Sequence, residues 1–291
     1  MTRTFQSEVG ALRRVVVKHA RDAFVDPPNI ERGWEDLGFL RPPDYERAVQ
    51  EYDGFITVLD GLRIDCMFLP LERDVGLDSL YVRDASVVSD RGVVLCNMGK
   101  PARAGEPEAQ EAAYRRWGIP IIGRVEGNGR LEGGDVVWLD DRTVAVGLGY
   151  RTNAEGARQF RALLPEAVEM VLVPLPHWKG PSDVFHLMSM LSPLDGNLAL
   201  VHSSLMPVPF RQLLLSREVE LVEAHPTEID DLACNVLAVA PRVCVMAAGA
   251  PETVSRLVAA GVEVHNFEAG EICLPGSGGP TCLTRPLERY T

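Results

Sequence analysis

A cysteine in the last part of the chain lies in a segment rich in glycine. The segment LPGSGGPTCLTRP, residues 274–286, contains Cys282. Glycine lets the backbone approach a ligand closely and adopt positive φ angles, so a cysteine on such a turn can present its sulfur to a cavity as a nucleophile. A terminal turn with a buried, unreactive thiol is the alternative. Cys66 and Cys244 lie in apolar runs and are expected to be packing residues.

Acidic residues occur in two places where the surrounding sequence is apolar. In GRLEGGDVVWL, residues 129–139, Glu132 and Asp135 flank two glycines directly before an apolar run. Buried carboxylates need a partner, because an unpaired buried charge costs several kcal/mol, and a cation or a histidine would serve. A polar hairpin turn is the alternative reading. In LYVRDASVV, Arg83 and Asp84 lie at the edge of a strand pattern; taken alone they would form a surface salt bridge.

Two histidines are candidates for proton transfer. His186 is followed by Leu187 and Met188 in an apolar run, whereas His177 lies among prolines in an expected loop. A lone histidine beside apolar residues is more often a hydrogen-bonded core group than a catalyst. An apolar environment is also what shifts the pKa of an imidazole and makes it useful as an acid or base, so we prefer His186.

The elements that position these residues alternate along the chain and predict an α/β fold. Helices are expected after the N-caps Asp44 and Asn153, and from Pro251 to a stop at Gly261. Residues 21–43 combine proline, glycine and charge, and are expected to form a loop of the kind that often serves as a lid. Strands are expected at residues 14–18, 64–69, 86–88, 93–96, 136–139, 144–146, 170–173, 198–202, 236–239, 243–247 and 262–265.

Composition narrows the class of protein. The 291 residues are 46% hydrophobic, and no linker or low-complexity tract divides them, so we expect one domain, residues 1–291. The sequence has neither an apolar run of about 18 residues nor a recognisable secretory signal, which predicts no membrane association and a cytoplasmic location. The formal net charge of −12 disfavours nucleic acid and anionic membranes as partners and suits a small cationic substrate.

Metal and cofactor sites are not indicated. The six cysteines show no CxxC spacing and no paired histidines, which disfavours a zinc site and, in the cytoplasm, disulfides. A manganese-dependent hydrolase of the arginase type would need an Asp/His cluster, and the sequence contains no DxHxD-like string. We therefore predict a reaction without metal or cofactor.

The motifs, taken in order, resemble those of the guanidine-modifying (amidinotransferase) superfamily, which includes dimethylarginine dimethylaminohydrolases, arginine deiminases and amidinotransferases. The resemblance extends from about residue 12 to residue 286. It implies a five-bladed α/β propeller (pentein), in which ββαβ units with pseudo-fivefold symmetry surround a central substrate channel. The motifs are RD at 83–84, LEGGD at 131–135, RTN at 151–153, FHL at 185–187, CNVL at 234–237 and GGPTCLTRP at 278–286.

The resemblance also implies roles for individual residues. Cys282 matches the nucleophile, His186 the general acid and base, and Glu132 the carboxylate that orients the histidine and contacts the guanidinium. The remaining candidates bind substrate: Asp84 and Asp135 as carboxylates near the guanidinium, Arg103 and Arg151 as cations for the substrate α-carboxylate, and Met188 beside the reacting group.

The chemistry expected of these residues is hydrolysis of a guanidino group. A guanidinium is a poor electrophile toward water, whereas a thiolate can attack it and give a covalent thiouronium on Cys282 that water then hydrolyses. His186 would protonate the departing amine and later remove a proton from water. The bound cation would itself lower the pKa of the thiol.

Substrate and outcome stay open at this stage. Arginine deiminases carry an aspartate where this chain has Met188, and dimethylarginine dimethylaminohydrolases commonly carry lysine there. Met188 could pack against N-methyl groups, which favours dimethylarginine, converted to citrulline and dimethylamine; a core residue is the alternative. An arginine deiminase, an amidinotransferase and, less favoured, a guanidine-binding protein without activity are the other readings. The oligomeric state is open, with a homodimer as one alternative.

Overall fold

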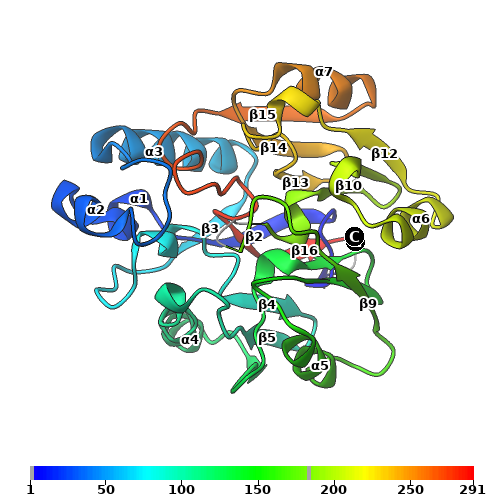
Figure 1. Cartoon of the computed structure of the whole chain (residues 1–291), viewed down its shortest axis with the longest axis horizontal. Helices are drawn as coiled ribbons and strands as arrows, with labels where there is room; N and C mark the ends of the chain where they lie inside the picture. The colour runs from blue at the N-terminus through cyan, green and yellow to red at the C-terminus, as the bar shows by residue number, and fades with distance from the viewer. Residues whose placement is uncertain (1–2, 182–184) are drawn as a thin grey trace.

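The strands form five separate small sheets arranged in a ring. The computed structural model describes residues 3–181 and 185–291. Seen down the shortest axis of the molecule, the helices α3, α4, α5, α6 and α7 lie on the outside of the ring, and the strands lie toward its centre (Figure 1). The predicted five-bladed α/β propeller is confirmed.

Each blade repeats one ββαβ unit. Its first two strands are antiparallel, and a helix then leads to a third strand parallel to the second. Four blades are β4 (Ser86–Ser89), β5 (Gly92–Leu95), α4 (Glu106–Arg116), β6 (Ile121–Arg124); β7 (Val136–Trp138), β8 (Thr143–Leu148), α5 (Ala154–Leu163), β9 (Glu169–Pro174); β10 (Leu191–Asp195), β11 (Leu198–Val201), α6 (Val208–Ser216), β12 (Glu220–Glu223); and β13 (Val236–Ala240), β14 (Val243–Ala247), α7 (Pro251–Ala259), β15 (Glu263–Phe267).

The remaining blade joins the two ends of the chain. Strand β16 (Arg285–Tyr290) pairs antiparallel with β2 (Ala11–Val17), which continues through α3 (Tyr45–Gly61) to β3 (Asp65–Phe68). The short strand β1 (Arg3–Thr4) adds to the outer edge of β16. The ring is therefore closed by hydrogen bonds between the first and last parts of the chain.

Local sequence explains most of these elements. The middle strands β8 and β11 are buried along nearly their whole length, which is why they consist of apolar residues without polar alternation. Helix α3 begins at the predicted N-cap: the Asp44 carboxylate accepts a hydrogen bond from the Arg47 amide at 2.9 Å. Asn153 caps α5 in the same way, accepting from Gly156 N at 2.8 Å. After α7, Gly261 has φ of +78°, as expected of a helix stop.

The prediction for residues 21–43 was wrong in part. This region contains two short helices, α1 (Ala20–Phe24) and α2 (Pro27–Gly33), before an irregular segment. Neither helix is long enough to show apolar periodicity. Asp26 nevertheless caps α2 by accepting from Asn29 N at 2.7 Å, and Ile30 is buried in the core.

Consecutive blades are connected where their first strands begin. At each of the five junctions, a hydrogen bond joins the first strand of one blade, or the segment directly before it, to the same part of the next blade. The bonds are Gly134 N to Asp84 Oδ1 (3.0 Å), Leu187 N to Asp135 Oδ1 (3.0 Å), Val236 N to Ser192 Oγ (3.1 Å), Thr281 N to Asn235 Oδ1 (3.1 Å) and Arg83 N to Cys282 O (3.2 Å). This closed circuit holds the segments before the five first strands together.

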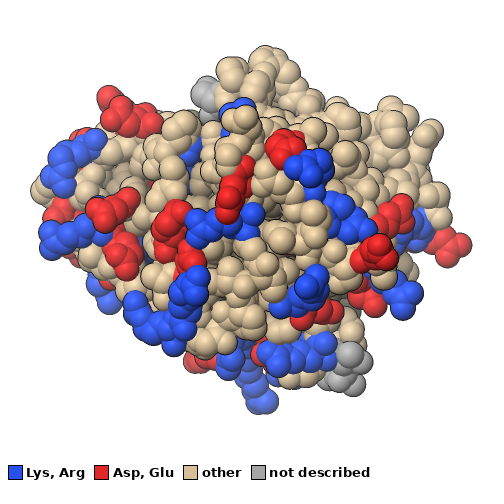
Figure 2. Space-filling model, turned by 90° about the horizontal axis from the view of Figure 1, so that it is seen from below, with Lys and Arg blue, Asp and Glu red and all other residues tan. Residues whose placement is uncertain are grey.

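The described helices and the face of the molecule seen in Figure 2 bear on possible membrane and nucleic-acid partners. Within the described residues, no helix combines the length and apolarity that crossing a bilayer requires. Seen from below, positive and negative side chains alternate across the visible face (Figure 2). The expectation that nucleic acid is not a partner stays a prediction.

Candidate active site

One polar residue comes from the start of each blade. Asp84, Glu132, His186, Asn235 and Cys282 each lie a few residues before β4, β7, β10, β13 and β16 in turn. Because the ring repeats one unit five times, these equivalent positions converge at one end of the axis. Sequence positions almost 200 residues apart therefore form one site.

A histidine lies between two carboxylates. His186 Nε2 is 2.8 Å from Glu132 Oε2, and Nδ1 is 3.9 Å from Asp84 Oδ1. All three side chains are buried. Burial lowers the pKa of His186, but the charges of Asp84 and Asp135 and the Glu132 hydrogen bond outweigh it and raise the pKa to about 9. At neutral pH the imidazole is therefore protonated and can act as a general acid.

The glycines of the LEGGD motif allow this histidine to approach. A Cβ on Gly134 would lie 2.6 Å from His186 Nδ1 and 2.9 Å from Asp84 Oδ1. A Cβ on Gly133 would lie 2.2 Å from the carbonyl oxygen of Arg83. The motif is thus not a hairpin turn; its backbone packs directly against two neighbouring blades.

The thiol of Cys282 is held on a rigid turn. Asn235 Nδ2 donates to Sγ at 3.3 Å, and Asn235 Oδ1 accepts from the Thr281 amide and hydroxyl at 3.1 and 2.7 Å. Arg83 Nε donates to the Thr281 carbonyl at 2.7 Å. Gly278 packs against the ring of Tyr81, where a Cβ would lie 2.5 Å from the ring. The glycine-rich segment is therefore fixed on both sides of Cys282.

The thiol is neutral before a substrate binds. Burial raises the pKa of Cys282, and the charge of Asp84 raises it further. The hydrogen bonds from Asn235 and Thr281 and the charge of Arg83 act in the opposite direction without cancelling the rise. A cation bound next to Asp84 would offset the carboxylate charge and favour the thiolate.

Both predicted cations for the substrate carboxylate are bound to protein carboxylates. Arg103 is buried, and its guanidinium contacts Asp84 Oδ2 at 2.6 Å and Glu106 Oε2 at 2.8 Å. Arg151 Nη1 lies 2.9 Å from Glu132 Oε2. Each arginine therefore neutralises a carboxylate beside His186 in this structure. Their predicted contact with the substrate α-carboxylate stays a prediction.

The charges of the carboxylates follow from these pairs. Burial raises the pKa of Asp84, but His186 and Arg103 outweigh it and hold the pKa below its usual value. For Glu132, burial also acts to raise the pKa, and the His186 hydrogen bond and the Arg151 charge bring it below normal. Both are ionised at neutral pH, as binding of a guanidinium requires.

Asp135 is placed differently from the other carboxylates. Its Oδ1 accepts from Leu187 N at 3.0 Å, which fixes the backbone next to His186, and its Oδ2 has no hydrogen-bond partner among the described residues. Burial raises its pKa to about 6. Asp135 lines neither cavity at Cys282. Its predicted contact with substrate stays a prediction, and the geometry favours an effect through His186.

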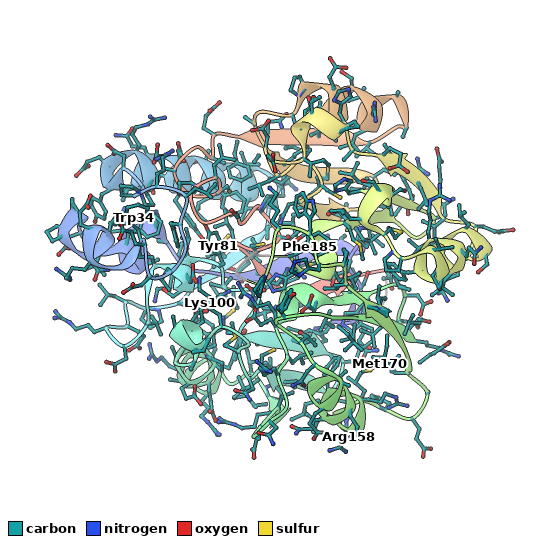
Figure 3. All side chains as sticks on the ribbon, in the orientation of Figure 1. Trp34, Tyr81, Lys100, Arg158, Met170 and Phe185 are labelled. Carbon is teal, nitrogen blue, oxygen red and sulfur yellow. The ribbon has the colours of Figure 1, made fainter. Side chains whose placement is uncertain are left out.

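Two cavities meet at Cys282 and His186. A small one of about 20 Å³ is also lined by Asp84, Arg103 and Arg151, so it contains most of the predicted charged residues. The other measures about 400 Å³ and is lined by Met188 together with Leu40, Trp178, Ile229 and Leu232, among others. Figure 3 shows Tyr81, Lys100 and Phe185 near this central region, while Arg158 and Met170 lie toward the periphery.

His177 lies outside this arrangement. Its Nδ1 contacts the hydroxyl of Tyr150, and it lines a separate cavity with Trp178. Sequence reasoning did not assign a role to Asn235, although it lies in the CNVL motif. An amide in an apolar run gives no local sign of contact with a thiol, so the motif was the only available signal.

The carboxylate and histidine groups also have the spacing of metal ligands. One ligand atom from each of Asp84, Glu132 and His186 lies within 4.8 Å of the others. Arg103 and Arg151 already neutralise the two carboxylates. Independence from metal stays a prediction.

Comparison with known proteins adds independent information. A family model described as arginine deiminase matches residues 78–219 and 210–289. A dimethylarginine dimethylaminohydrolase of Pseudomonas aeruginosa is 29% identical over 249 residues, covering 84% of this chain and 90% of that protein. One of Streptomyces coelicolor is 30% identical over 247 residues, covering 83% and 86%. A structure of the Pseudomonas aeruginosa enzyme with citrulline superposes with a TM-score of 0.76 at 24% identity, covering 96% of this chain and 99% of the other.

Proposed function

Because the chain belongs to the arginine deiminase family, we propose that it hydrolyses the guanidino group of an N-substituted arginine, with dimethylarginine converted to citrulline and dimethylamine. One observation carries the proposal. A thiol, a histidine with a pKa of about 9 and an ionised carboxylate line the same cavity. The two relatives named above as dimethylarginine dimethylaminohydrolases support this choice of substrate.

Substrate binding prepares the nucleophile. The guanidinium binds beside Asp84, and its positive charge offsets the carboxylate charge that raises the pKa of Cys282. The thiol proton passes to solvent water, because His186 is already protonated, and Sγ forms a bond to the central guanidinium carbon. Asn235 Nδ2 donates to the sulfur and keeps it directed at the cavity.

His186 then releases the amine. The tetrahedral adduct loses dimethylamine when His186 donates its proton to the substituted nitrogen and the C–N bond breaks. A cationic thiouronium remains on Cys282. Glu132, hydrogen-bonded to Nε2, holds the ring in place during the transfer.

Water completes the reaction. Neutral His186 removes a proton from a water molecule, whose oxygen attacks the thiouronium carbon. The C–S bond breaks, citrulline forms, and the thiolate regains a proton. The two half-reactions use His186 in opposite senses, first as acid and then as base.

Preference for an N-substituted arginine rests on Met188. The thioether lies beside His186 on the wall of the larger cavity, where an aspartate of a deiminase would require hydrogen bonds from unsubstituted nitrogens. Burying such a carboxylate without donors costs about 1–3 kcal/mol, whereas a thioether makes no such demand. The larger cavity offers room for methyl groups next to the departing nitrogen.

The test compares kcat/KM for asymmetric dimethylarginine and for arginine on one enzyme preparation. We expect dimethylarginine to be preferred, with citrulline as product, and Met188→Asp to shift the preference toward arginine. A tenfold preference of the wild-type enzyme for arginine would contradict the substrate assignment and leave a deiminase. A new guanidino compound in the presence of glycine, instead of citrulline, would indicate an amidinotransferase.

A further inference from the structure

Three arginines are buried in β16 and in the segment before β4. Arg83 has no exposed surface, and Arg285 and Arg289 are 5% and 1% exposed. The last two belong to β16, the strand that closes the ring. Arg285 Nη2 donates to the carbonyl oxygen of Arg83 at 2.6 Å, which joins the start of β16 to the segment before β4. We call these three residues the arginine cluster.

The cluster contains more positive charge than its neighbours balance. Glu8 is its one carboxylate neighbour among the described residues, 3.4 Å from Arg83 Nη1. Within that part of the chain, neither Arg285 nor Arg289 forms an ion pair with a carboxylate side chain. Burial, and after it the charge of Arg83, lowers the pKa of Arg285 to about 10, so this guanidinium is still protonated at neutral pH. Three buried cations thus face one anion.

Some N–H groups of these three guanidinium groups have no hydrogen-bond acceptor among the described residues. Arg289 Nη1 donates to Gly10 O at 2.6 Å, but its Nε and Nη2 have no hydrogen-bond partner in the described chain. The same holds for Arg83 Nη2 and Arg285 Nε. A buried donor without an acceptor costs about 1–3 kcal/mol, and more when it is charged. Water could accept these hydrogen bonds, but it would not supply the missing negative charge.

We propose that the arginine cluster binds a small monovalent inorganic anion, such as chloride, as a structural ligand of the closed ring. The anion accepts hydrogen bonds from the free N–H groups of Arg83, Arg285 and Arg289 and offsets one of the two positive charges that Glu8 leaves uncompensated. The surroundings favour a small ion, because a Cβ on neighbouring Gly133 would already lie 2.5 Å from Arg285 Nη2. A substrate carboxylate does not explain the cluster, since Arg285 and Arg289 line neither cavity at Cys282.

Anion binding at this place stabilises ring closure. The ion contacts side chains from β16 and from the segment before β4, and Arg289 also holds the backbone at Gly10, directly before β2. A ligand that binds the folded state alone adds RT ln(1 + [L]/Kd) to the free energy of unfolding, so the unfolding temperature rises with the ligand concentration. General ionic screening depends on ionic strength alone, so a rise at constant ionic strength that depends on which anion is present is a different effect.

The experiment begins with wild-type protein transferred to sodium gluconate. Its thermal unfolding is followed while chloride or bromide replaces gluconate at constant ionic strength. We expect Tm to rise with either halide, and to keep rising with the logarithm of the halide concentration once the site is mostly occupied. A crystal grown with bromide is expected to show an anomalous peak in contact with Arg285 and Arg289. Equal Tm values in chloride and gluconate, together with no bromide peak, would overturn the proposal and leave water as the occupant.

Variants separate the cluster from other halide effects. Arg289→Met should abolish the halide-dependent part of the Tm, and Arg116→Met, on the exposed face of α4, should leave it unchanged. Glu8→Gln removes the one carboxylate neighbour, so it should enlarge the dependence on halide. If Arg289→Met does not fold, the halide titrations of the wild-type protein and of Glu8→Gln still test whether the cluster binds the anion. A halide effect of wild-type size in both Glu8→Gln and Arg289→Met would contradict the assignment.

Discussion

The surroundings of Cys282 distinguish it from the other five cysteines. Cys96, Cys234, Cys244 and Cys273 are buried, and Cys66, which is partly exposed, lines neither of the two cavities at Cys282. Cys282 is partly exposed to two cavities and accepts a hydrogen bond from Asn235. Reactive thiols combine access with neighbours that stabilise the thiolate.

Cys282→Ser is therefore expected to abolish turnover and leave the fold intact. A serine hydroxyl retains the size and the hydrogen bonds but is a far weaker nucleophile at neutral pH. Mass spectrometry of acid-quenched wild-type reactions should detect an adduct on the peptide that contains Cys282. Cys66→Ser serves as the matched control and should remain active. Full activity of Cys282→Ser, or an adduct elsewhere, would refute the assignment.

His186→Ala is expected to lower kcat by roughly 10²–10⁴-fold, the usual loss for a general acid and base. Substrate binding should change less, because Asp84 and Glu132 remain. His177→Ala is the control, since His177 contacts Tyr150 outside the site. The measurement is kcat and KM for both variants. A larger loss in His177→Ala would reverse the roles of the two histidines.

The raised pKa of His186 also predicts how stability depends on pH. The folded state keeps the proton up to a pH of about 9, whereas an unfolded histidine loses it near pH 6.5. The stabilisation from His186 is complete below pH 6.5 and is lost as the pH rises toward 9, at up to about 1.4 kcal/mol per pH unit. Denaturant unfolding of wild type and His186→Gln between pH 6 and 10 measures the difference. Parallel curves for the two proteins would show that His186 does not titrate in this way.

Among the elements, α5 is tied at its beginning to the loop that precedes Glu132. Asn153 caps the helix and also contacts the loop between β6 and β7. Its side chain accepts a hydrogen bond from Arg130 N at 3.0 Å and donates one to Asn128 O at 2.8 Å. Gly156 in the first turn packs against the same loop, where a Cβ would lie 1.9 Å from Arg130 O. The beginning of α5 is thus tied to the residues just before Glu132.

Asn153→Ala is expected to reduce the free energy of unfolding by about 1 kcal/mol, the usual cost of losing an N-cap. Loss of the contacts with Arg130 and Asn128 should add to this cost. Asn128→Ala is the control, because its contribution to the contact is a backbone carbonyl. Denaturant unfolding compares the two. Equal stability of both variants would show that the cap contributes little.

The elements that sequence predicted are those with an apolar pattern of their own. Every predicted strand is present, but β16, β10, β12, β6 and the two-residue β1 were missed. In β16, the sequence RPLERY contains two buried arginines. A polar residue at a buried position does not follow the apolar pattern by which strands are predicted, so this strand was missed. Helices α4 and α6 were missed as well. Their lengths and places are set by packing onto sheets that pair distant parts of the chain.

The site could be predicted as a set of residues but not as a set of contacts. The motifs and their order along the chain were enough to predict that Cys282, His186 and Asp84 belong to one site. The pair of Arg103 with Asp84 was not accessible, because it depends on how the loop after β5 folds back onto the segment before β4. Asn235 was missed because an amide in an apolar run gives no local sign that it contacts a thiol in the neighbouring blade.

At the scale of the molecule, the two ends of the chain meet in one sheet. Arg3 pairs with Tyr290, and β16 pairs with β2 along most of its length. A short linker could therefore connect residues 3 and 290 without distorting the ring. The Arg217–Glu218 turn between α6 and β12 is exposed and far along the chain from the five site segments.

A circular permutant with new ends at Arg217–Glu218 is expected to fold and to keep most of the activity. Loops with exposed tips tolerate such openings. The matched control places the new ends between Leu283 and Thr284 with the same linker, which separates the nucleophile from β16. It should fold less stably and be inactive. Activity assays and thermal unfolding compare the two. Similar activity in both permutants would show that continuity from Cys282 to β16 is not needed.

The hydrogen-bonded circuit between blades has a consequence for chains that are still folding. The thiol is held by a residue of the neighbouring blade, and the histidine lies between carboxylates of two others. A chain with one blade detached would therefore lack the contacts that bring Cys282, His186 and Asp84 together, on which the proposed reaction depends. The proposed mechanism therefore predicts that Cys282 gains its reactivity toward guanidines only when the ring closes.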